Sequence, residues 1–193
     1  NQILGLEPLL ASYALAIALV FDAISDPLVG AWSDRFKSKW GRRHPFVYIA
    51  IIPFGLSAYY LYSIPTDTSQ TALFIKLLIA SILLRTLFTF YETPRAAIGP
   101  ELITDYERRN TLSGYGVLYG NMGLGIMSYV MLAFFLVETE TFSGSSAFLN
   151  PDAYPKFGLL ACILIIIFGF ISSLSTHKYI PNMVEPEPKQ FKF

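Results

Sequence analysis

The sequence predicts an all-α membrane protein with five transmembrane helices. Hydrophobic residues make up 53% of its 193 residues and charged residues only 15%, whereas a soluble domain carries about 25% charged residues. The mean hydropathy is +0.48. Five apolar runs reach the roughly 20 residues that a helix needs to cross a bilayer. Helices are expected because a backbone exposed to lipid must satisfy its own hydrogen bonds.

The expected helices follow one another along residues 8–176. Their predicted spans are Pro8 to Ser33, Pro45 to Ile64, Thr71 to Thr93, Thr111 to Val137 and Phe157 to Thr176. The third can continue past Pro94 towards Pro100. Cys162 is the single cysteine and lies inside the last run, so it forms no internal disulfide and should face lipid or the protein core.

The charges of the loops predict an orientation. Basic residues gather in the first loop, the third loop and the C-terminal tail, namely Arg35, Lys37, Lys39, Arg42, Arg43, Arg95, Arg108, Arg109, Lys178, Lys189 and Lys192. The positive-inside rule makes that side cytoplasmic in an inner or plasma membrane. We therefore expect Asn1 outside and Phe193 in the cytoplasm, with one helix preceding Asn1. The net charge of zero predicts no nucleic-acid partner.

Two aspartates lie within the first predicted helix. Asp22 and Asp26 are four residues apart, so their carboxylates share one helix face. A charge in the middle of a bilayer costs roughly 2.5–3.5 kcal/mol on insertion scales. Such a pair should therefore face the protein interior and meet a cation, a proton or a basic partner.

Four residues of the third helix also share one face: Arg85, Phe88, Thr89 and Glu92. Counted from the loops that follow each helix, Glu92 should lie at the depth of Asp22. Carboxylates from two helices at one depth, with the Thr89 hydroxyl beside them, make an oxygen site that suits a small cation. Asp22, Asp26 and Glu92 are the predicted ligands of Na⁺ if sodium is the coupling ion. The alternative is a structural network in which Arg85 neutralises one acid and the others are protonated.

The same face is the predicted substrate site. Arg85 offers a fork of donors that suits a carboxylate or sulfate, and Phe88 and Glu92 lie beside it. Alternatively, Arg85 pairs only with Glu92 or Asp22.

Charges of both signs in two loops predict an ion-pair latch on the cytoplasmic side. Its predicted members are Asp34, Arg35, Arg42, Arg43, Asp105, Glu107 and Arg108. Such a latch would close one side of an alternating-access cycle, and the alternative is charge that serves topology only. Gly116 and Gly120 in the fourth helix form a small-xxx-small pair that favours close helix packing. His44 and His177 are interpreted as ordinary residues at the membrane edges.

Two stretches resemble a known family. The first runs from Asp22-Ala-Ile-Ser-Asp26-Pro27 through Asp34-Arg35 to Gly41-Arg42-Arg43-His44-Pro45, and the second from Pro94-Arg95 to Glu107-Arg108. They are similar to the two signatures of the glycoside–pentoside–hexuronide:cation symporters of the major facilitator superfamily. The resemblance covers about residues 9–178.

The resemblance implies a fold and a set of roles. Residues 1–180 would be an N-terminal bundle holding the second to sixth of twelve helices, and residues 181–193 the start of a cytoplasmic central linker before a C-terminal half. The family's two aspartates fall on Asp22 and Asp26, its sugar- and cation-binding acid on Glu92, and its polar cation contact on Thr89. The region around Gly114 lacks the arginine of melibiose permease, and Arg85 is not part of that permease's pattern.

The predicted function is cation-coupled symport of a sugar, glycoside or uronide by alternating access, with Na⁺ or H⁺ as coupling ion, no other cofactor and no enzymatic activity. One alternative is a lipid or organic-anion transporter on the same fold, since the two tryptophans, Trp32 and Trp40, lie near a loop and do not supply a sugar-stacking wall. A membrane prenyltransferase is a remote alternative because the chain has one loose acidic cluster and no second one. A non-transporting sensor with the same fold is the last.

Overall fold

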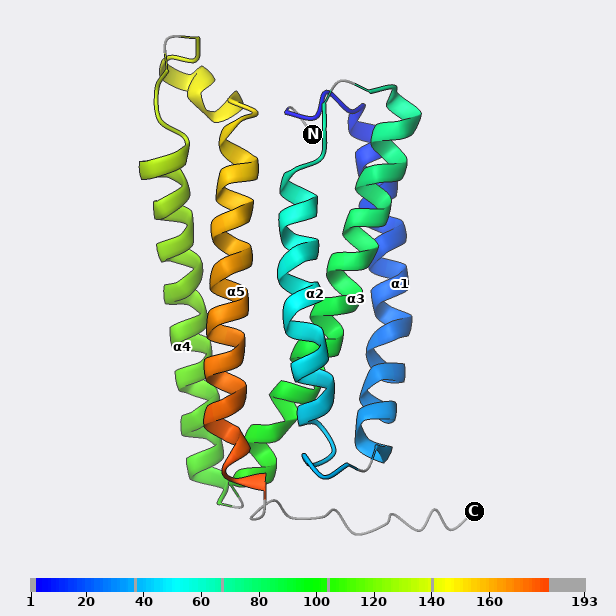
Figure 1. Ribbon diagram of the computed structural model, residues 1–193, viewed down its shortest axis with the longest axis vertical. Helices are drawn as coiled ribbons and strands as arrows, with labels where there is room; N and C mark the ends of the chain where they lie inside the picture. Colours follow the sequence, from blue (N-terminus) through cyan, green and yellow to red (C-terminus); the bar gives the residue numbers. More distant parts are fainter. Residues whose placement is uncertain (1–2, 37, 67, 104, 140, 181–193) are drawn as a thin grey trace.

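A computed structural model describes residues 3–36, 38–66, 68–103, 105–139 and 141–180. These residues form five long helices and two short ones (Figure 1). Their order is α1 (Pro8–Arg35), α2 (His44–Tyr62), α3 (Gln70–Leu102), α4 (Tyr106–Val130), η1 (Met131–Phe135), η2 (Gly144–Leu149) and α5 (Ala153–His177). The predicted linker at residues 181–193 lies outside the described residues.

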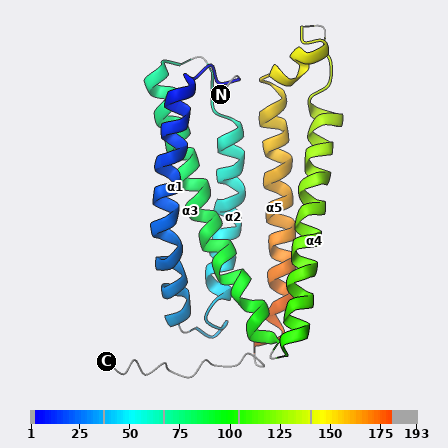
Figure 2. The same ribbon diagram turned by 180° about the vertical axis from the view of Figure 1, so that it is seen from behind.

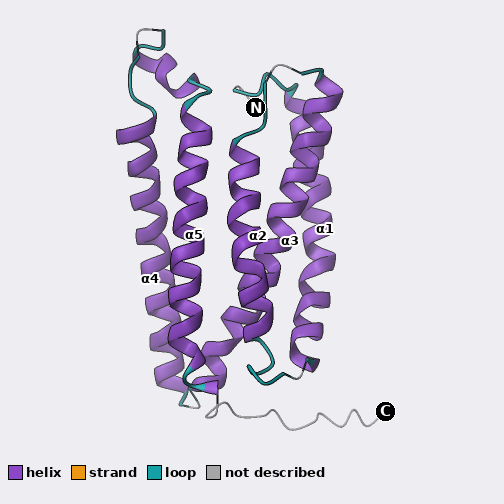
Figure 3. Cartoon of the chain, viewed as in Figure 1, coloured by secondary structure: helices purple, strands orange, loops and turns teal. Residues whose placement is uncertain are grey.

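The described chain is helical, and Figure 3 shows helices joined by loops with no strand among the described residues. Five of the helices are long and apolar enough to cross a membrane. The prediction of an all-α protein with five such helices is confirmed. α4 begins five residues before the predicted start at Thr111, because Asp105 caps it by accepting a 2.9 Å hydrogen bond from the backbone N–H of Glu107.

α3 continues well beyond the predicted Thr93. It runs through Pro94, whose ring removes one backbone donor and crowds the preceding turn. The lower part of α3 turns towards the foot of α4 in both Figure 1 and Figure 2. We attribute this bend to Pro94. The bend separates the part of α3 that holds Arg85 and Thr89 from the part that reaches the basic loops.

The helices pack in an open arrangement. α3 packs against both α1 and α2, and α2 packs against α5. α4 has no buried residue, and an added Cβ at its Gly116 or Gly120 would meet nothing within 4 Å. Within the described part of the chain, the predicted close packing at this glycine pair is therefore absent.

Different glycines allow the close approach of α2 to α5. A Cβ at Gly158 would lie 2.6 Å from Cβ of Tyr62, and a Cβ at Gly55 would lie 3.0 Å from the carbonyl oxygen of Cys162. Real Cβ atoms essentially never approach as closely as 2.6 Å, so a larger residue at Gly158 would force the two helices to shift, and one at Gly55 would make an unusually tight contact. Cys162 is buried at this interface, as a core-facing position requires.

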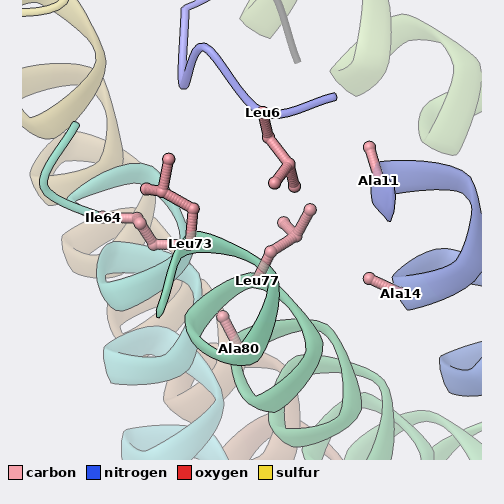
Figure 4. Close-up of a cluster of buried hydrophobic side chains, with 7 residues drawn as sticks. All are labelled: Leu6, Ala11, Ala14, Ile64, Leu73, Leu77 and Ala80. Carbon is pink, nitrogen blue, oxygen red and sulfur yellow. The ribbon is translucent and has the colours of Figure 1, made fainter. Parts of the chain in front are cut away.

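An apolar cluster closes the end of the bundle opposite the basic loops. Figure 4 shows its side chains converging from the N-terminal segment, α1, α3 and the loop after α2. Its buried members are Leu6, Ala11, Ala14, Ile64, Leu73, Leu77 and Ala80. Alanines on α1 face leucines on α3, so the two helices come close without a void. This cluster helps to set the register in which α1 and α3 present their polar groups.

His44 differs from the prediction. It is fully buried, and its Nε2 lies 3.1 Å from Oγ1 of Thr176 on α5. Tyr48 Oη lies 3.0 Å from Nδ1 of His177, and the rings of the two histidines are 5.6 Å apart. These polar contacts tie the start of α2 to the end of α5, so His44 is a packing residue rather than an ordinary residue at the membrane edge.

Candidate functional site

The polar faces of α1 and α3 meet in the middle of the bundle. Arg85 donates from Nη1 to Oδ2 of Asp22 at 3.0 Å. Oγ1 of Thr89 lies 2.7 Å from Oδ1 of Asp26 and 3.3 Å from Oδ1 of Asp22. Asp22, Asp26, Arg85 and Thr89 are called the polar cluster below. The structure thus brings together four of the predicted site residues.

Thr89 lies between two acceptors but has one proton to donate. A hydroxyl is a single donor, and the shorter contact gives that proton to Asp26. The Oδ1 atom of Asp22, 3.3 Å away, then faces a second oxygen without a proton between them. With both aspartates ionised, the polar cluster holds two negative charges against the one positive charge of Arg85. One further proton or small cation would balance it.

Glu92 does not join the polar cluster. Its two carboxylate oxygens each accept a 2.7 Å hydrogen bond from Arg95, which follows three residues later on α3. The register of the helices explains the difference, since Asp22 is level with Arg85 and Thr89, whereas Glu92 lies about 4.5 Å beyond Thr89 along the helix axis. The prediction that Glu92 lies at the depth of Asp22 is corrected.

The predicted set of three metal ligands is likewise not assembled. Among the described residues, no group of three or more His, Cys, Asp or Glu is placed to hold a metal ion. Asp22 and Asp26 supply two carboxylates and Thr89 a neutral oxygen, and these oxygens are the ones that face one another. Two carboxylates and one hydroxyl can hold a proton, or a small cation whose further ligands come from groups outside this set.

The polar cluster borders a cavity of about 880 Å³. Its polar side is formed by Asp22 and Arg85. Phe88 lies beside them, and its ring is 5.6 Å from that of Phe54 on α2. The opposite walls come from α4 and α5 and are apolar and aromatic. Their members include Ile126, Met127, Phe157, Leu164 and Phe168. The predicted substrate residues Arg85 and Phe88 therefore face one cavity together.

A second cavity lies nearer the basic loops. It measures about 900 Å³ and is lined by the Glu92–Arg95 pair, by residues of α4 that include Ser113 and Tyr115, and by the end of α5. Its walls are more polar than those of the first cavity. Glu92 and Arg85, predicted to contact one substrate, thus line two different cavities.

Ion pairs hold the basic end of the bundle together. Glu101 at the end of α3 accepts from Arg42 at 3.1 Å and lies 3.0 Å from Arg43, and Arg43 also reaches Asp34 at 2.6 Å. The predicted members Asp34, Arg42 and Arg43 therefore meet. Glu101 is the central acid, and the prediction missed it although it lies between Pro100 and Asp105 in the same charged stretch.

The other predicted latch residues lie apart from this group. Asp105 caps α4 and is 3.8 Å from Arg108, whose side chain is 82% exposed. Glu107 lies in the first turn of α4. Arg35 ends α1, is exposed, and has no ion pair among the described residues. The basic end therefore contains one compact set of ion pairs between the first loop and α3, and separate charges around the start of α4.

Comparison with known proteins agrees with this architecture. The family described as MFS/sugar transport protein matches residues 1–193. Inner membrane symporter YicJ of Escherichia coli is 32% identical over 68% of this chain and 28% of its own length. Putative glycoside/cation symporter YagG of the same organism is 28% identical over 60% of this chain and 25% of its own length.

A lipid symporter is also similar. Sodium-dependent lysophosphatidylcholine symporter 1 of Mus musculus is 32% identical over 56% of this chain and 21% of its own length. The chain spans between 21% and 28% of the length of these three curated relatives. The five apolar helices and the symporter relatives identify an integral membrane protein. The chain belongs to the MFS/sugar transport protein family, as its resemblance to the glycoside–pentoside–hexuronide:cation symporters predicted.

Proposed function

We propose that this chain forms part of the N-terminal half of a cation-coupled symporter for a sugar, glycoside or uronide. A second helical bundle would complete the transporter, and substrate would bind between the two bundles near the middle of the membrane. The observation that carries the proposal is the polar cluster, in which one hydroxyl proton serves two carboxylates. A site that lacks one positive charge is a site for a coupling ion.

Asp26 is the group that we expect to take the coupling ion. Arg85 already neutralises Asp22 at 3.0 Å, whereas the polar contact of Asp26 within the described residues is the Thr89 hydroxyl. A proton on Asp26 would remove the excess negative charge, and Thr89 would then be free to donate to Asp22. A sodium ion between the aspartates would do the same through Coulomb attraction. Either step lowers the cost of closing the site away from water.

Arg85 is the group that we expect to recognise substrate. Its side chain is 35% exposed, and it lines the cavity of about 880 Å³ with Phe88. Once an ion neutralises the aspartates, the guanidinium is held less tightly and can donate to sugar hydroxyls or to the carboxylate of a uronide. Glu92 would join this substrate or ion site only in a state in which Arg95 releases it.

The basic end would be cytoplasmic in this proposal. The ion pairs around Glu101 then act as the latch, since they join the first loop to α3 on the side that must open for release. Breaking and re-forming them would accompany the alternation between inward-facing and outward-facing states.

A lysolipid is the second candidate substrate. The far walls of the cavity are largely apolar, and the two tryptophans of the chain do not line it. One relative is by name a sodium-dependent lysophosphatidylcholine symporter. An apolar wall facing a charged one would suit an acyl chain with a zwitterionic headgroup, whereas a sugar would have to stack on Phe54, Phe88 or Tyr62.

The test is ion-driven uptake by the complete transporter in sealed vesicles, with and without an imposed Na⁺ or proton gradient. A galactoside, a xyloside, a glucuronide and lysophosphatidylcholine serve as probes. We expect Asp26→Asn to abolish gradient-driven uptake while leaving exchange of internal for external substrate, because the asparagine mimics the ion-loaded site. Glu7→Gln, a change at an exposed carboxylate near the far end, is the control. Full gradient dependence in both Asp26→Asn and Asp22→Asn would disprove the proposal.

A further inference from the structure

A separate groove opens on the outer side of the bundle at its basic end. It has a volume of about 340 Å³ and lies between α1 and α2, with α3 as its floor. That size falls within the roughly 300–1,000 Å³ of typical ligand pockets. Trp32 and Ile49 at its rim are 56% and 75% exposed, so it is open at the side. Apart from the hydroxyl of Thr86 and the indole N–H of Trp32, its lining side chains are apolar.

The groove faces away from the polar cluster. On α3 its floor is Leu83, Thr86, Leu87 and Phe90, whereas the polar cluster uses Arg85 and Thr89. At about 100° per residue the mean directions of the two sets differ by roughly 130° around the helix. Among the described residues the groove is lined by α1, α2 and α3 alone, so no other described helix covers it. It does not belong to the proposed transport site.

Aromatic contacts hold the groove open. The ring of Trp32 lies 5.2 Å from that of Phe46 and 6.0 Å from that of Phe90, both edge to face, and Phe46 stacks on Phe90 at 6.4 Å. Phe36 also contacts Phe46, at 5.2 Å. Rings that fix one another cannot rotate freely to fill the space. The groove is therefore preformed, and along α2 it extends from Pro45 to Pro53, about 12 Å at 1.5 Å per residue.

Positive charge that forms no ion pair with a described acid lies close to the α1 side of the groove. Arg35 follows Trp32 by three residues and so lies on the same side of α1. Arg35 and Lys39 are exposed and have no ion pair among the described residues, whereas Arg42 and Arg43 are bound by Glu101 and Asp34. An apolar slot that ends beside unpaired cations complements a molecule with an apolar tail and an anionic head.

We propose that this groove is a binding site for an anionic phospholipid of the leaflet at the basic end. One acyl chain lies between α1 and α2 against Trp32 and Phe90, and the phosphate lies beside Arg35 and Lys39. An acyl chain supplies the contacts that an empty apolar groove would lack. The basic residues select an anionic headgroup over a zwitterionic one, as basic residues beside transmembrane helices commonly do.

The test uses the complete transporter in vesicles that contain phosphatidylglycerol or phosphatidylcholine with a photoactivatable group near the acyl-chain end. Crosslinks are mapped by mass spectrometry, and no transport is required, so the result is independent of the proposed function. We expect phosphatidylglycerol to label residues 32–36 and 45–53 roughly 25-fold more than phosphatidylcholine does, about fivefold for each of the two cations. Arg35→Gln and Lys39→Gln should each reduce this preference, by roughly fivefold per cation. Lys156→Gln, at the other end of the bundle, should not.

A steric variant completes the test. Leu83→Trp places a larger ring in the groove and should block labelling, whereas Ile79→Trp, one turn away on the same exposed side of α3, should not. Equal labelling by both lipids would show ordinary boundary lipid and overturn the proposal. Absence of labelling from these segments, with lipid crosslinks elsewhere, would show that another part of the transporter covers the groove and would also overturn it.

Discussion

At the scale of single residues, the polar cluster that we propose as the ion site consists of few groups. The two aspartates lie one turn apart on α1, and the hydroxyl of Thr89 on α3 reaches the carboxylates of both. Arg85 keeps one of the two charges tolerable when no ion is bound. The remaining charge makes the site responsive, since its neutralisation changes what Thr89 donates to and how tightly Arg85 is held.

Thr89→Val should weaken binding of Na⁺, if Na⁺ is the coupling ion, without preventing insertion. The substitution keeps the shape of the side chain and removes the donor. Valine cannot supply the neutral oxygen that Thr89 offers to Na⁺ beside the two carboxylates, so the apparent affinity for Na⁺ should fall, roughly tenfold for a lost contact of about 1.4 kcal/mol. The measurement is uptake as a function of Na⁺ concentration or pH. Thr89→Ser should restore most of the affinity, and an unchanged affinity in Thr89→Val would contradict the role of the hydroxyl.

The sequence was sufficient to predict which polar residues share a helix face, but not which acid pairs with which arginine. The shared face of Asp22 and Asp26 follows from four-residue spacing, and so does that of Arg85 and Thr89. The partner of Glu92 does not follow from spacing, because spacing places both Arg85 and Arg95 within reach of it. Glu101 was missed for a similar reason: several acids lie in the same stretch, and only the end of α3 determines which one meets Arg42 and Arg43.

At the scale of helices, the packing of α2 against α5 depends on small residues. Gly55, Gly158 and Gly169 each lie where a Cβ would come within 3.2 Å of the facing helix. The sequence draws attention to the run of glycines in α4 instead, because five of them lie within twelve residues. The number of glycines in a helix is thus a poor guide to close helix packing, because close approach depends on whether the face that carries them meets another helix.

Gly158→Ala should destabilise the contact of α2 with α5. Its Cβ would lie 2.6 Å from Cβ of Tyr62, so the helices must shift, and overpacking of this kind costs about 1–3 kcal/mol. The readout is the rate at which a thiol reagent modifies Cys162, which is buried at this interface. We expect faster modification and a lower melting temperature. Gly120→Ala is the matched control, since nothing lies within 4 Å of its added Cβ, and equal effects of both changes would refute the explanation.

At the scale of the whole molecule, charge and polarity are arranged along the long axis of the bundle. The apolar cluster around Leu73 closes one end, the polar cluster lies near the middle, and the ion pairs of Glu101 hold the other end. The ends of α1, α3 and α5 and the starts of α2 and α4 all lie at the lower end in Figure 1. This arrangement separates the proposed ion site from the contacts that we propose to open and close.

The basic end should face the cytoplasm. In the complete transporter with Cys162 and any further native cysteines replaced by Ala, a single cysteine at Lys39 (Lys39→Cys) should react with a membrane-impermeant thiol reagent only after the cytoplasmic side is exposed. Ser143→Cys, in the loop at the opposite end, should react in intact cells. Both positions are exposed in the structure. The reverse pattern would show that the excess of basic residues does not determine the orientation here.

Composition and residue spacing were sufficient for the number of spans, the basic end and the polar faces of two helices, because these follow from hydropathy and from the 3.6-residue period alone. The structure was needed to show that Asp22 is level with Arg85 rather than with Glu92, that His44 is buried against α5, and that α3 continues through Pro94. Those features depend on the rotation and register of one helix against another. Both are set by side-chain packing between segments far apart in the chain, about which local periodicity carries no information.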